Sequence, residues 1–514
     1  MEGSLHASTF AKVAQTLLGQ ITRFANGPCT GGTITPLALP WHVRYESFAG
    51  ALPLISSVSL SIAGLKINGN AFGVNCLYGT ATSLARLILN VNSSWLVTGV
   101  RADERVTVPL ASGTFCPSTA TMSGTGLVTA LNSPASIRVT LLAPPPPPAI
   151  VTVGDSFMSG EAGRWAGNTA TLGAAAIDAL GGNAYSDEGG NLERIWLCHR
   201  SRSWQGGIGV NGVPLTENLA CSGAKRTTFI AAENGDFKPG LDFYSEGAER
   251  GQALMLKEYA LAHPNAIRMV AISIGGNDFG FGQLVYNCVF AFYNPFGGDC
   301  RDETFGRRVV EANNLAATVI AVTDGIREVR RAMLEAGYAD NSYRLLVENY
   351  VSPVPPAELL RRYTDAQRGE IGGCPIRAAD LTWTNETVIP QLEWAVWQGA
   401  QTTQLPNVAR LDVRRAFEGR RLCEISVGLL EENGFAGWNE PGAVDDVEWV
   451  NHVRRVDDQN ALYRQESVHP NYWGQLALRR CVRLAYNNGA PRSGRCRING
   501  PGLIGGEPDM RLDP

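Results

Sequence analysis

Three widely separated stretches carry side chains of the types needed for acyl transfer. Ser156 follows the apolar run 149–153 in a Gly-Asp-Ser turn, Asn277 lies in a Gly-Gly-Asn-Asp turn, and His469 lies in a Ser-Val-His-Pro-Asn stretch. Splitting an ester through an acyl-enzyme requires a hydroxyl nucleophile, a base that takes its proton, and donors for the developing oxyanion. A serine, a histidine and an amide flanked by glycine meet these three requirements.

The elements around these residues are expected to bring them together. From residue 149 onward, strand and helix patterns alternate, with strands expected at 149–153, 267–274, 345–351 and 408–413 and helices at 319–333 and after His469. This alternation predicts an α/β fold with a parallel sheet covered by helices on both faces. Groups that follow the strands then meet at the carboxyl edge of the sheet. The turn around Gly223 can add a backbone N–H donor.

Each motif taken alone has an ordinary structural explanation. A serine after aspartate and a Gly-Gly-Asn sequence are both common in turns, and a single loop histidine is usually solvated. The joint occurrence of all of them after strands or in loops favours the catalytic interpretation.

Residues 148–490 resemble the SGNH (GDSL-type) hydrolase superfamily, and are most similar to its secreted, disulfide-bonded actinobacterial esterases and lipases. The resemblance rests on Gly154-Asp155-Ser156, Ala220-Cys221-Ser222-Gly223-Ala224, Gly275-Gly276-Asn277-Asp278 and Glu466-Ser467-Val468-His469-Pro470-Asn471. It implies a flavodoxin-like sheet flanked by helices, Ser156 as nucleophile and His469 as general base. It also implies an oxyanion hole formed by the Ser156 and Gly223 backbone N–H groups and the Asn277 side chain, and no cofactor.

The sequence departs from the family pattern at two positions. The family commonly has aspartate three residues before the catalytic histidine, where this chain has Glu466. We expect the Glu466 carboxylate to orient His469, and the alternative, also found in the family, is a backbone carbonyl. Arg420 replaces a histidine that the family often has after glycine, which is expected to alter the substrate cleft.

The chain has 11 cysteines and no Cys-x-x-Cys pair, which favours disulfides in an oxidising compartment over structural zinc or buried cytosolic thiols. Cys76 and Cys116 are the expected pair in the N-terminal region, with Cys29 left over. The family pattern implies three pairs, and closeness in sequence suggests a fourth: Cys198–Cys221, Cys288–Cys300, Cys374–Cys423 and, from closeness alone, Cys481–Cys496. A bonded Cys221 is a poor nucleophile. Asp155 and Asp278 are expected to fix loops, and no metal site is expected.

Five regions are predicted along the chain. Apolar residues at helical spacing predict an amphipathic helix within residues 1–28, which either packs on its own protein or lies on a membrane surface. Period-two patterns predict a β-rich domain at 29–143. The proline run 144–148 reads as a stiff linker, 149–490 as the hydrolase domain and 491–514 as a surface tail.

Composition limits the partners of the protein. A net charge of −4 gives no basis for nucleic-acid binding, and no segment is expected to cross a membrane. Residues 1–30 contain no recognisable signal peptide, so an export signal has been removed or escapes recognition. The sequence does not predict an oligomeric state.

The aromatic segment 286–296 reads either as a packed loop or as an acyl-chain wall or lid. Together these observations predict a secreted serine esterase or lipase that acts on a lipid or an acylated carbohydrate. One alternative is a polysaccharide deacetylase whose β domain binds glycan. Another is a binding protein with an inactive hydrolase domain.

Overall fold

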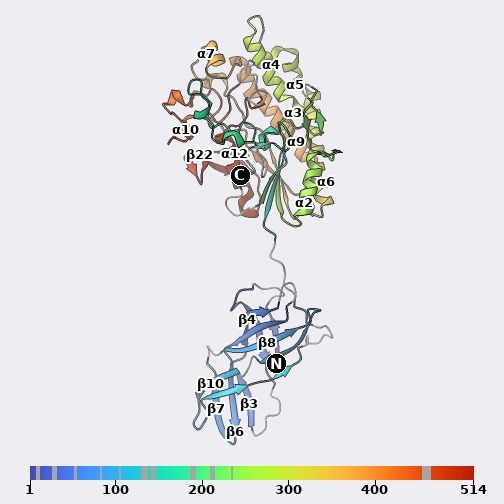
Figure 1. Ribbon diagram of the computed structural model, residues 1–514, viewed down its shortest axis with the longest axis vertical. Helices are drawn as coiled ribbons and strands as arrows, with labels where there is room; N and C mark the ends of the chain where they lie inside the picture. Colours follow the sequence, from blue (N-terminus) through green and yellow to red (C-terminus); the bar gives the residue numbers. More distant parts are fainter. Residues whose placement is uncertain are drawn as a thin grey trace. The chain divides into compact units, whose positions relative to one another are not determined.

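The computed structural model describes residues 1–6, 12–25, 32–50, 55–80, 84–102, 106–128, 137–139, 146–185, 193–208, 215–232, 235–453 and 465–514. The chain divides into two compact units, Met1–Pro144 and Pro145–Pro514 (Figure 1). Each is described by itself.

The first unit consists of two antiparallel sheets. A seven-stranded sheet has the order β1 (Glu2–Leu5), β2 (Leu17–Arg23), β4 (Trp41–Ala49), β5 (Ser57–Ala63), β8 (Leu84–Val91), β9 (Val97–Ala102) and β12 (Thr125–Gly126). A five-stranded sheet has the order β11 (Thr119–Met122), β10 (Val106–Ser112), β7 (Val74–Tyr78), β6 (Lys66–Ala71) and β3 (Gly32–Leu37). Alternating apolar side chains such as Val58, Leu60 and Ile62 on β5 supply the core of this unit.

The predicted N-terminal helix is wrong for the described residues, which form β1 and β2 instead. The apolar spacing that suggested a helix fits a strand with a bulge, because the register of β2 against β4 shifts between Leu17 and Gly19 and leaves Leu18 and Ile21 buried. Gly19 and the β-branched Thr16 and Thr22 were signals against a helix. Cys29 lies outside the described residues.

The second unit is built on one seven-stranded sheet. Its order is β14 (Leu215–Asn218), β13 (Ala149–Gly154), β19 (Ile267–Ser273), β20 (Arg344–Glu348), β21 (Val408–Asp412), β22 (Gly494–Ile504) and β23 (Glu507–Asp513). All neighbours are parallel except β22 and β23. Every residue of β13 is buried, as expected for a parallel sheet covered on both faces.

Helices cover this sheet (Figure 1). On one face, α6 (Ala312–Glu335) packs against both α2 (Gln252–Ala262) and α9 (Ile389–Thr402), and α12 (Tyr472–Tyr486) packs against β21 and β23. Other helices lie in the connections: α1 (Ser156–Ser159), α3 (Gly276–Phe279), α4 (Phe281–Tyr293), α5 (Thr304–Val309), α7 (Asp365–Glu370), α8 (Ala378–Trp383) and α10 (Ala443–Asp446). The structure is therefore a mixed α/β unit with a parallel sheet, together with a β-rich unit.

Residues 491–514 were predicted to be a surface tail, and this is wrong. They form the β22–β23 hairpin, which extends the sheet and buries Cys496 and Met510. Gly505 and Gly506 turn the hairpin with φ of 62° and 84°, so the Gly-Gly pair that suggested a loose tail is a hairpin signal.

Candidate active site

Ser156 lies where β13 ends. Gly154 has φ of 136°, and a Cβ there would lie 2.0 Å from the Ser273 carbonyl oxygen, so the turn requires glycine. Asp155 caps α1 by accepting the Phe157 N–H at 3.2 Å. This cap places Ser156 in the first turn of a helix at the carboxyl edge of the sheet, with only 6% of its surface exposed.

His469 faces Ser156 across this edge. Its Nε2 lies 2.7 Å from the Ser156 Oγ, and its Nδ1 lies 3.0 Å from the Ser467 carbonyl oxygen. Backbone bonds to Asn451 hold the turn, since Asn451 donates to the His469 carbonyl and accepts from the Val468 N–H. Burial lowers the pKa of His469, which favours the neutral imidazole that a general base requires.

The Glu466 carboxylate bonds to Trp165 and Tyr185 and not to the His469 imidazole, which corrects the expectation that it orients the ring. The carboxylate accepts hydrogen bonds from the Trp165 indole, at 2.6 Å, and from the Tyr185 hydroxyl. It is buried, and burial raises its pKa to about 7. The physical reason is the tight turn at 465–469. It directs the Ser467 carbonyl toward Nδ1, while Glu466 stays buried and its carboxylate points away from the imidazole.

The two predicted oxyanion segments are joined to each other. The Asn277 side-chain amide donates to the Ala224 carbonyl at 3.0 Å, so the β19 turn is fastened to the segment that contains Gly223. Gly223 has φ of 81°, and the Cys198–Cys221 disulfide and a 3.0 Å bond from the Ser222 N–H to the Cys198 carbonyl hold its turn. Both segments follow strands that flank β13, on its opposite sides.

Tyr350, which the sequence analysis missed, connects two of these turns. Its hydroxyl donates to the Asp155 carboxylate and accepts the Gly276 N–H at 2.8 Å. Asp155 is fully buried, and burial raises its pKa to about 7 although the bond from Tyr350 works in the opposite direction. Tyr350 lies two residues after β20 (Arg344–Glu348), so its position at the carboxyl edge was a usable signal.

Gln252, also missed, fixes the end of β13. Its side-chain oxygen accepts from the Gly154 N–H at 2.7 Å, and its nitrogen donates to the Gly154 and Pro239 carbonyls. Because both backbone groups of Gly154 are held, the turn before Ser156 has a defined geometry.

A buried acid–base pair lies beside the histidine turn. His199 Nδ1 and Glu161 Oε1 are 2.5 Å apart with both side chains fully buried. Burial alone would raise the Glu161 pKa, but His199 lowers it to about 2, so Glu161 is an anion. Its second oxygen accepts from the Gln465 side chain at 3.0 Å, which ties the helix turn after Ser156 to the segment before His469.

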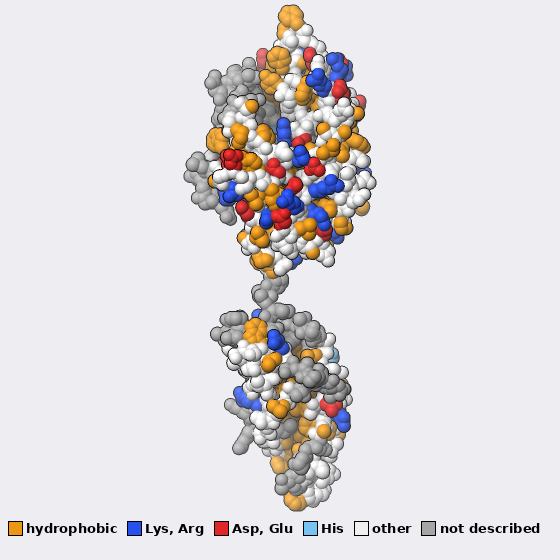
Figure 2. Space-filling view, turned by 90° about the vertical axis from the view of Figure 1, so that its right-hand side faces the viewer, with side chains coloured by type: hydrophobic (Ala, Val, Ile, Leu, Met, Phe, Trp, Pro, Cys, Tyr) orange, Lys and Arg blue, Asp and Glu red, His pale blue; other side chains and the backbone are white. Residues whose placement is uncertain are grey.

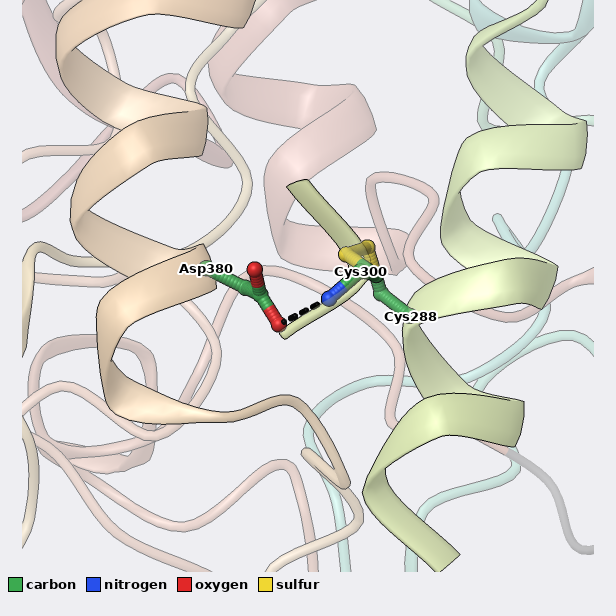
Figure 3. Close-up of side chains that lie close together, drawn as sticks. All are labelled: Cys288, Cys300 and Asp380. Atoms are coloured by element: carbon green, nitrogen blue, oxygen red, sulfur yellow. Dashed lines mark hydrogen bonds between the residues drawn. A yellow bond between two sulfur atoms is a disulfide. The ribbon is translucent and has the colours of Figure 1, made fainter. Parts of the chain in front are cut away.

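The cysteines lie in the five pairs named from the sequence. Cys76–Cys116, Cys198–Cys221, Cys288–Cys300, Cys374–Cys423 and Cys481–Cys496 are all bonded. Cys288 and Cys300 also lie close to Asp380, whose carboxylate accepts the Cys300 backbone N–H (Figure 3). The same carboxylate accepts the Arg301 backbone N–H at 3.1 Å. These three side chains have a structural role, because the two sulfurs form a disulfide and the carboxylate accepts hydrogen bonds from backbone N–H groups.

Asp278 and Arg420, which the sequence also marked for attention, contact other parts of the protein. Asp278 accepts the Arg226 N–H, as expected of a residue that fixes a loop. Arg420 pairs with Asp445 at 3.6 Å and lies over the Trp449 ring. No helix in the described part of the chain has the length and apolar character needed to cross a membrane.

Two hollows are present on the second unit. One is a narrow apolar crevice of about 10 Å³ beside the histidine turn, lined by Phe281, Leu284, Val285, Cys288, Pro353, Val354, Ile376, Thr384 and Val468. The other is a cleft of about 420 Å³ past the carboxyl end of β21, lined by Glu393, Asp412, Arg414, Arg415, Arg495, Cys496 and Arg497. The larger cleft contains none of the candidate catalytic residues, and Arg414 pairs there with Glu393.

Neither a protein-family model nor a curated protein sequence matches the chain. Among solved structures, it is similar to phospholipase A1 from Streptomyces albidoflavus NA297, with 15% identity, a TM-score of 0.35 and coverage of 66% of this chain and 98% of that chain. An extracellular lipase from Streptomyces rimosus gives 16% identity, a TM-score of 0.31 and coverage of 64% and 94%. A family two carbohydrate esterase from Clostridium thermocellum gives 12% identity, a TM-score of 0.30 and coverage of 90% and 95%.

Proposed function

We propose that the protein is a serine hydrolase of carboxylic esters and a member of the SGNH (GDSL-type) superfamily. The observation that carries this proposal is the 2.7 Å contact between His469 Nε2 and Ser156 Oγ, with Nδ1 held at 3.0 Å from the Ser467 carbonyl. The strand order β14-β13-β19-β20-β21 supports a flavodoxin-like core, because it runs second, first, third, fourth and fifth along the chain.

In the proposed reaction, Ser156 Oγ attacks the ester carbonyl carbon while its proton passes to His469 Nε2. The Ser467 carbonyl accepts a hydrogen bond from the Nδ1–H group, which leaves Nε2 unprotonated and free to act as the base. The oxyanion of the tetrahedral intermediate is stabilised by the backbone N–H groups of Ser156 and Gly223 and by the Asn277 side chain. When the intermediate collapses, the alcohol leaves with the proton from His469. Water then attacks the acyl-enzyme by the same route and releases the acid.

The charge that develops on His469 has a partner nearby. The Glu161 carboxylate raises the His469 pKa, against the larger opposite effect of burial and the smaller opposite effect of His199. Because Glu161 is paired with His199, it is fixed and ionised before substrate binds. A fixed anion of this kind stabilises imidazolium at little reorganisation cost.

We also propose that the protein is secreted. The five disulfides support this, since such bonds form and persist in oxidising compartments.

A fluorophosphonate probe tests the proposed nucleophile. The wild type should be labelled at Ser156, and Ser156→Ala and His469→Ala should lose both labelling and hydrolysis of p-nitrophenyl esters. Ser159→Ala, three residues further along the same short helix, is the matched control and should retain labelling. Labelling or esterase activity that persists in Ser156→Ala contradicts the proposal, and an unlabelled wild type favours a non-catalytic binding protein.

A further inference from the structure

We propose that a row of exposed aromatic side chains on α4 docks the protein on a phospholipid surface with uncharged or zwitterionic headgroups, from which it takes its ester substrate. We call Tyr286, Phe290, Tyr293 and Phe296 the aromatic crest. The proposal rests on the ester hydrolase function and names the physical form of its substrate.

The crest is exposed where aromatic rings are usually buried. Tyr286, Phe290 and Tyr293 follow one another at i, i+4 and i+7 on α4 and are 62%, 65% and 51% exposed, and Phe296 just beyond the helix is 97% exposed. Figure 2 shows hydrophobic side chains at the end of the unit where Figure 1 places α4. Clustered exposed apolar groups of this kind are typical of interaction surfaces.

The segment that carries the crest is also free of charge. From Phe279 to Gly298 the chain has no lysine, arginine, aspartate or glutamate. Aromatic rings favour the boundary between lipid headgroups and acyl chains, where a charged side chain would add a desolvation cost or a dependence on anionic lipid. The expected surface is therefore zwitterionic, and binding should depend little on salt.

The crest is rigidly mounted, which argues against a loosely packed loop. The Cys288–Cys300 disulfide ties α4 to the next segment, and Asp380 holds that segment through two backbone N–H groups (Figure 3). Arg377 donates to three carbonyls at the carboxyl end of α4, those of Ala291, Asn294 and Gly297. A surface that is already ordered loses little conformational entropy on binding.

The helix that carries the crest follows the Asn277 turn and lines the crevice beside the histidine turn. α4 follows α3, which contains Asn277, and the opposite face of α4 lines the apolar crevice through Phe281, Leu284 and Val285. Val468, next to His469, lines the same crevice. A lipid surface that contacts the crest would therefore meet the helix that lines this crevice beside the histidine turn.

Vesicle cosedimentation tests the docking without catalysis. In a Ser156→Ala background, the protein should bind phosphatidylcholine vesicles about equally at low and high salt. Adding Phe290→Ser together with Phe296→Ser should weaken binding at least about tenfold, since two aromatic side chains leave the lipid. Trp394→Ser is the matched control, because Trp394 is also an exposed aromatic residue, 48% exposed, but lies on α9. It should bind like the parent, and thermal unfolding should show all variants folded.

Activity measurements separate this proposal from the proposed function. With Ser156 intact, the Phe290→Ser, Phe296→Ser variant should hydrolyse a soluble short-chain ester within about twofold of the wild type but lose at least about tenfold on an ester embedded in the vesicles. No vesicle binding by the parent, unchanged binding by the crest variant, or self-association that the crest substitutions abolish would overturn the docking proposal. Loss of all hydrolysis and probe labelling in the wild type would instead overturn the proposed function, and the cosedimentation result would stand.

Discussion

The Ser467 carbonyl oxygen, 3.0 Å from His469 Nδ1, occupies the position that a carboxylate takes in a Ser–His–Asp arrangement. Glu466 is the adjacent residue, yet its carboxylate turns away to Trp165 and Tyr185. A neutral acceptor can hold the tautomer, but it contributes less than a full charge to the stability of imidazolium. The anionic Glu161 acts in the stabilising direction, since it raises the His469 pKa, while its partner His199 lowers that pKa.

Glu466→Gln should therefore reduce kcat by less than about tenfold, or under about 1.4 kcal/mol of barrier. The glutamine can still accept from Trp165, so the turn at 465–469 keeps its place. Glu466→Asp should lower the melting temperature more than Glu466→Gln does, because the shorter side chain draws away from both donors. Steady-state kinetics near pH 8 and thermal unfolding measure both effects. A loss of about 10⁴ in kcat, as seen when a triad aspartate is neutralised, would return Glu466 to the catalytic role.

The pH dependence of kcat/KM provides a second test. Burial lowers the pKa of His469 below its ordinary value of 6.5, and the base must be neutral to take the serine proton. Activity should thus rise through one ionisation on the acid side, with a midpoint below 6.5, and stay level above it. A profile of kcat/KM between about pH 4 and pH 9 on a soluble ester shows this. A midpoint at or above 7 would mean that the nearby anions outweigh burial.

The sequence was sufficient to predict that Ser156, Asn277 and His469 lie at the carboxyl edge of the sheet, because each follows an apolar strand run or stands in a marked loop motif. It could not choose between Glu466 and the Ser467 carbonyl, since a backbone acceptor leaves no trace in residue type. The choice depends on the turn conformation, in which Val468 has φ of 63°. Partners such as Gln252 come from elements whose docking the sequence does not specify.

The fold was predictable to a similar degree. Parallel strands such as β13 and β19 are buried on both faces and appear as continuous apolar runs. The errors fell at the two ends of the chain: near the N-terminus a short apolar set fits more than one period, and near the C-terminus a Gly-Gly hairpin turn resembles a loop. Leu17, Leu18 and Ile21 satisfy helical spacing, but pairing with β4 decides for a bulged strand.

Tyr350→Phe tests the link between the Ser156 and Asn277 turns. Removing the hydroxyl leaves the buried Asp155 carboxyl and the Gly276 N–H without this partner, which should cost about 1–3 kcal/mol of unfolding free energy. We also expect kcat to fall, because the oxyanion donors and the nucleophile lose a shared support. Tyr286→Phe, at an exposed position, is the control. It should change neither the unfolding free energy nor kcat on a soluble ester. Unchanged stability and kcat in Tyr350→Phe would show that the two turns are held independently.

Glu348→Gln should make the protein more stable at alkaline pH. Glu348 ends β20 with 1% of its surface exposed, and burial raises its pKa to about 8. The folded state therefore binds this proton more tightly than the unfolded state, whose glutamate pKa is near 4.5. Stability that this group supports at low pH is lost as the pH rises from about 4.5 to about 8.

The neutral glutamine avoids that loss, so the stability advantage of Glu348→Gln over the wild type should grow through this window. It should reach at least about 1 kcal/mol at pH 9, since one pKa unit corresponds to about 1.4 kcal/mol. Chemical denaturation at pH 5 and pH 9 measures the difference, with the exposed Glu386→Gln as control. An advantage that is equal at the two pH values would show that Glu348 ionises normally in the folded protein.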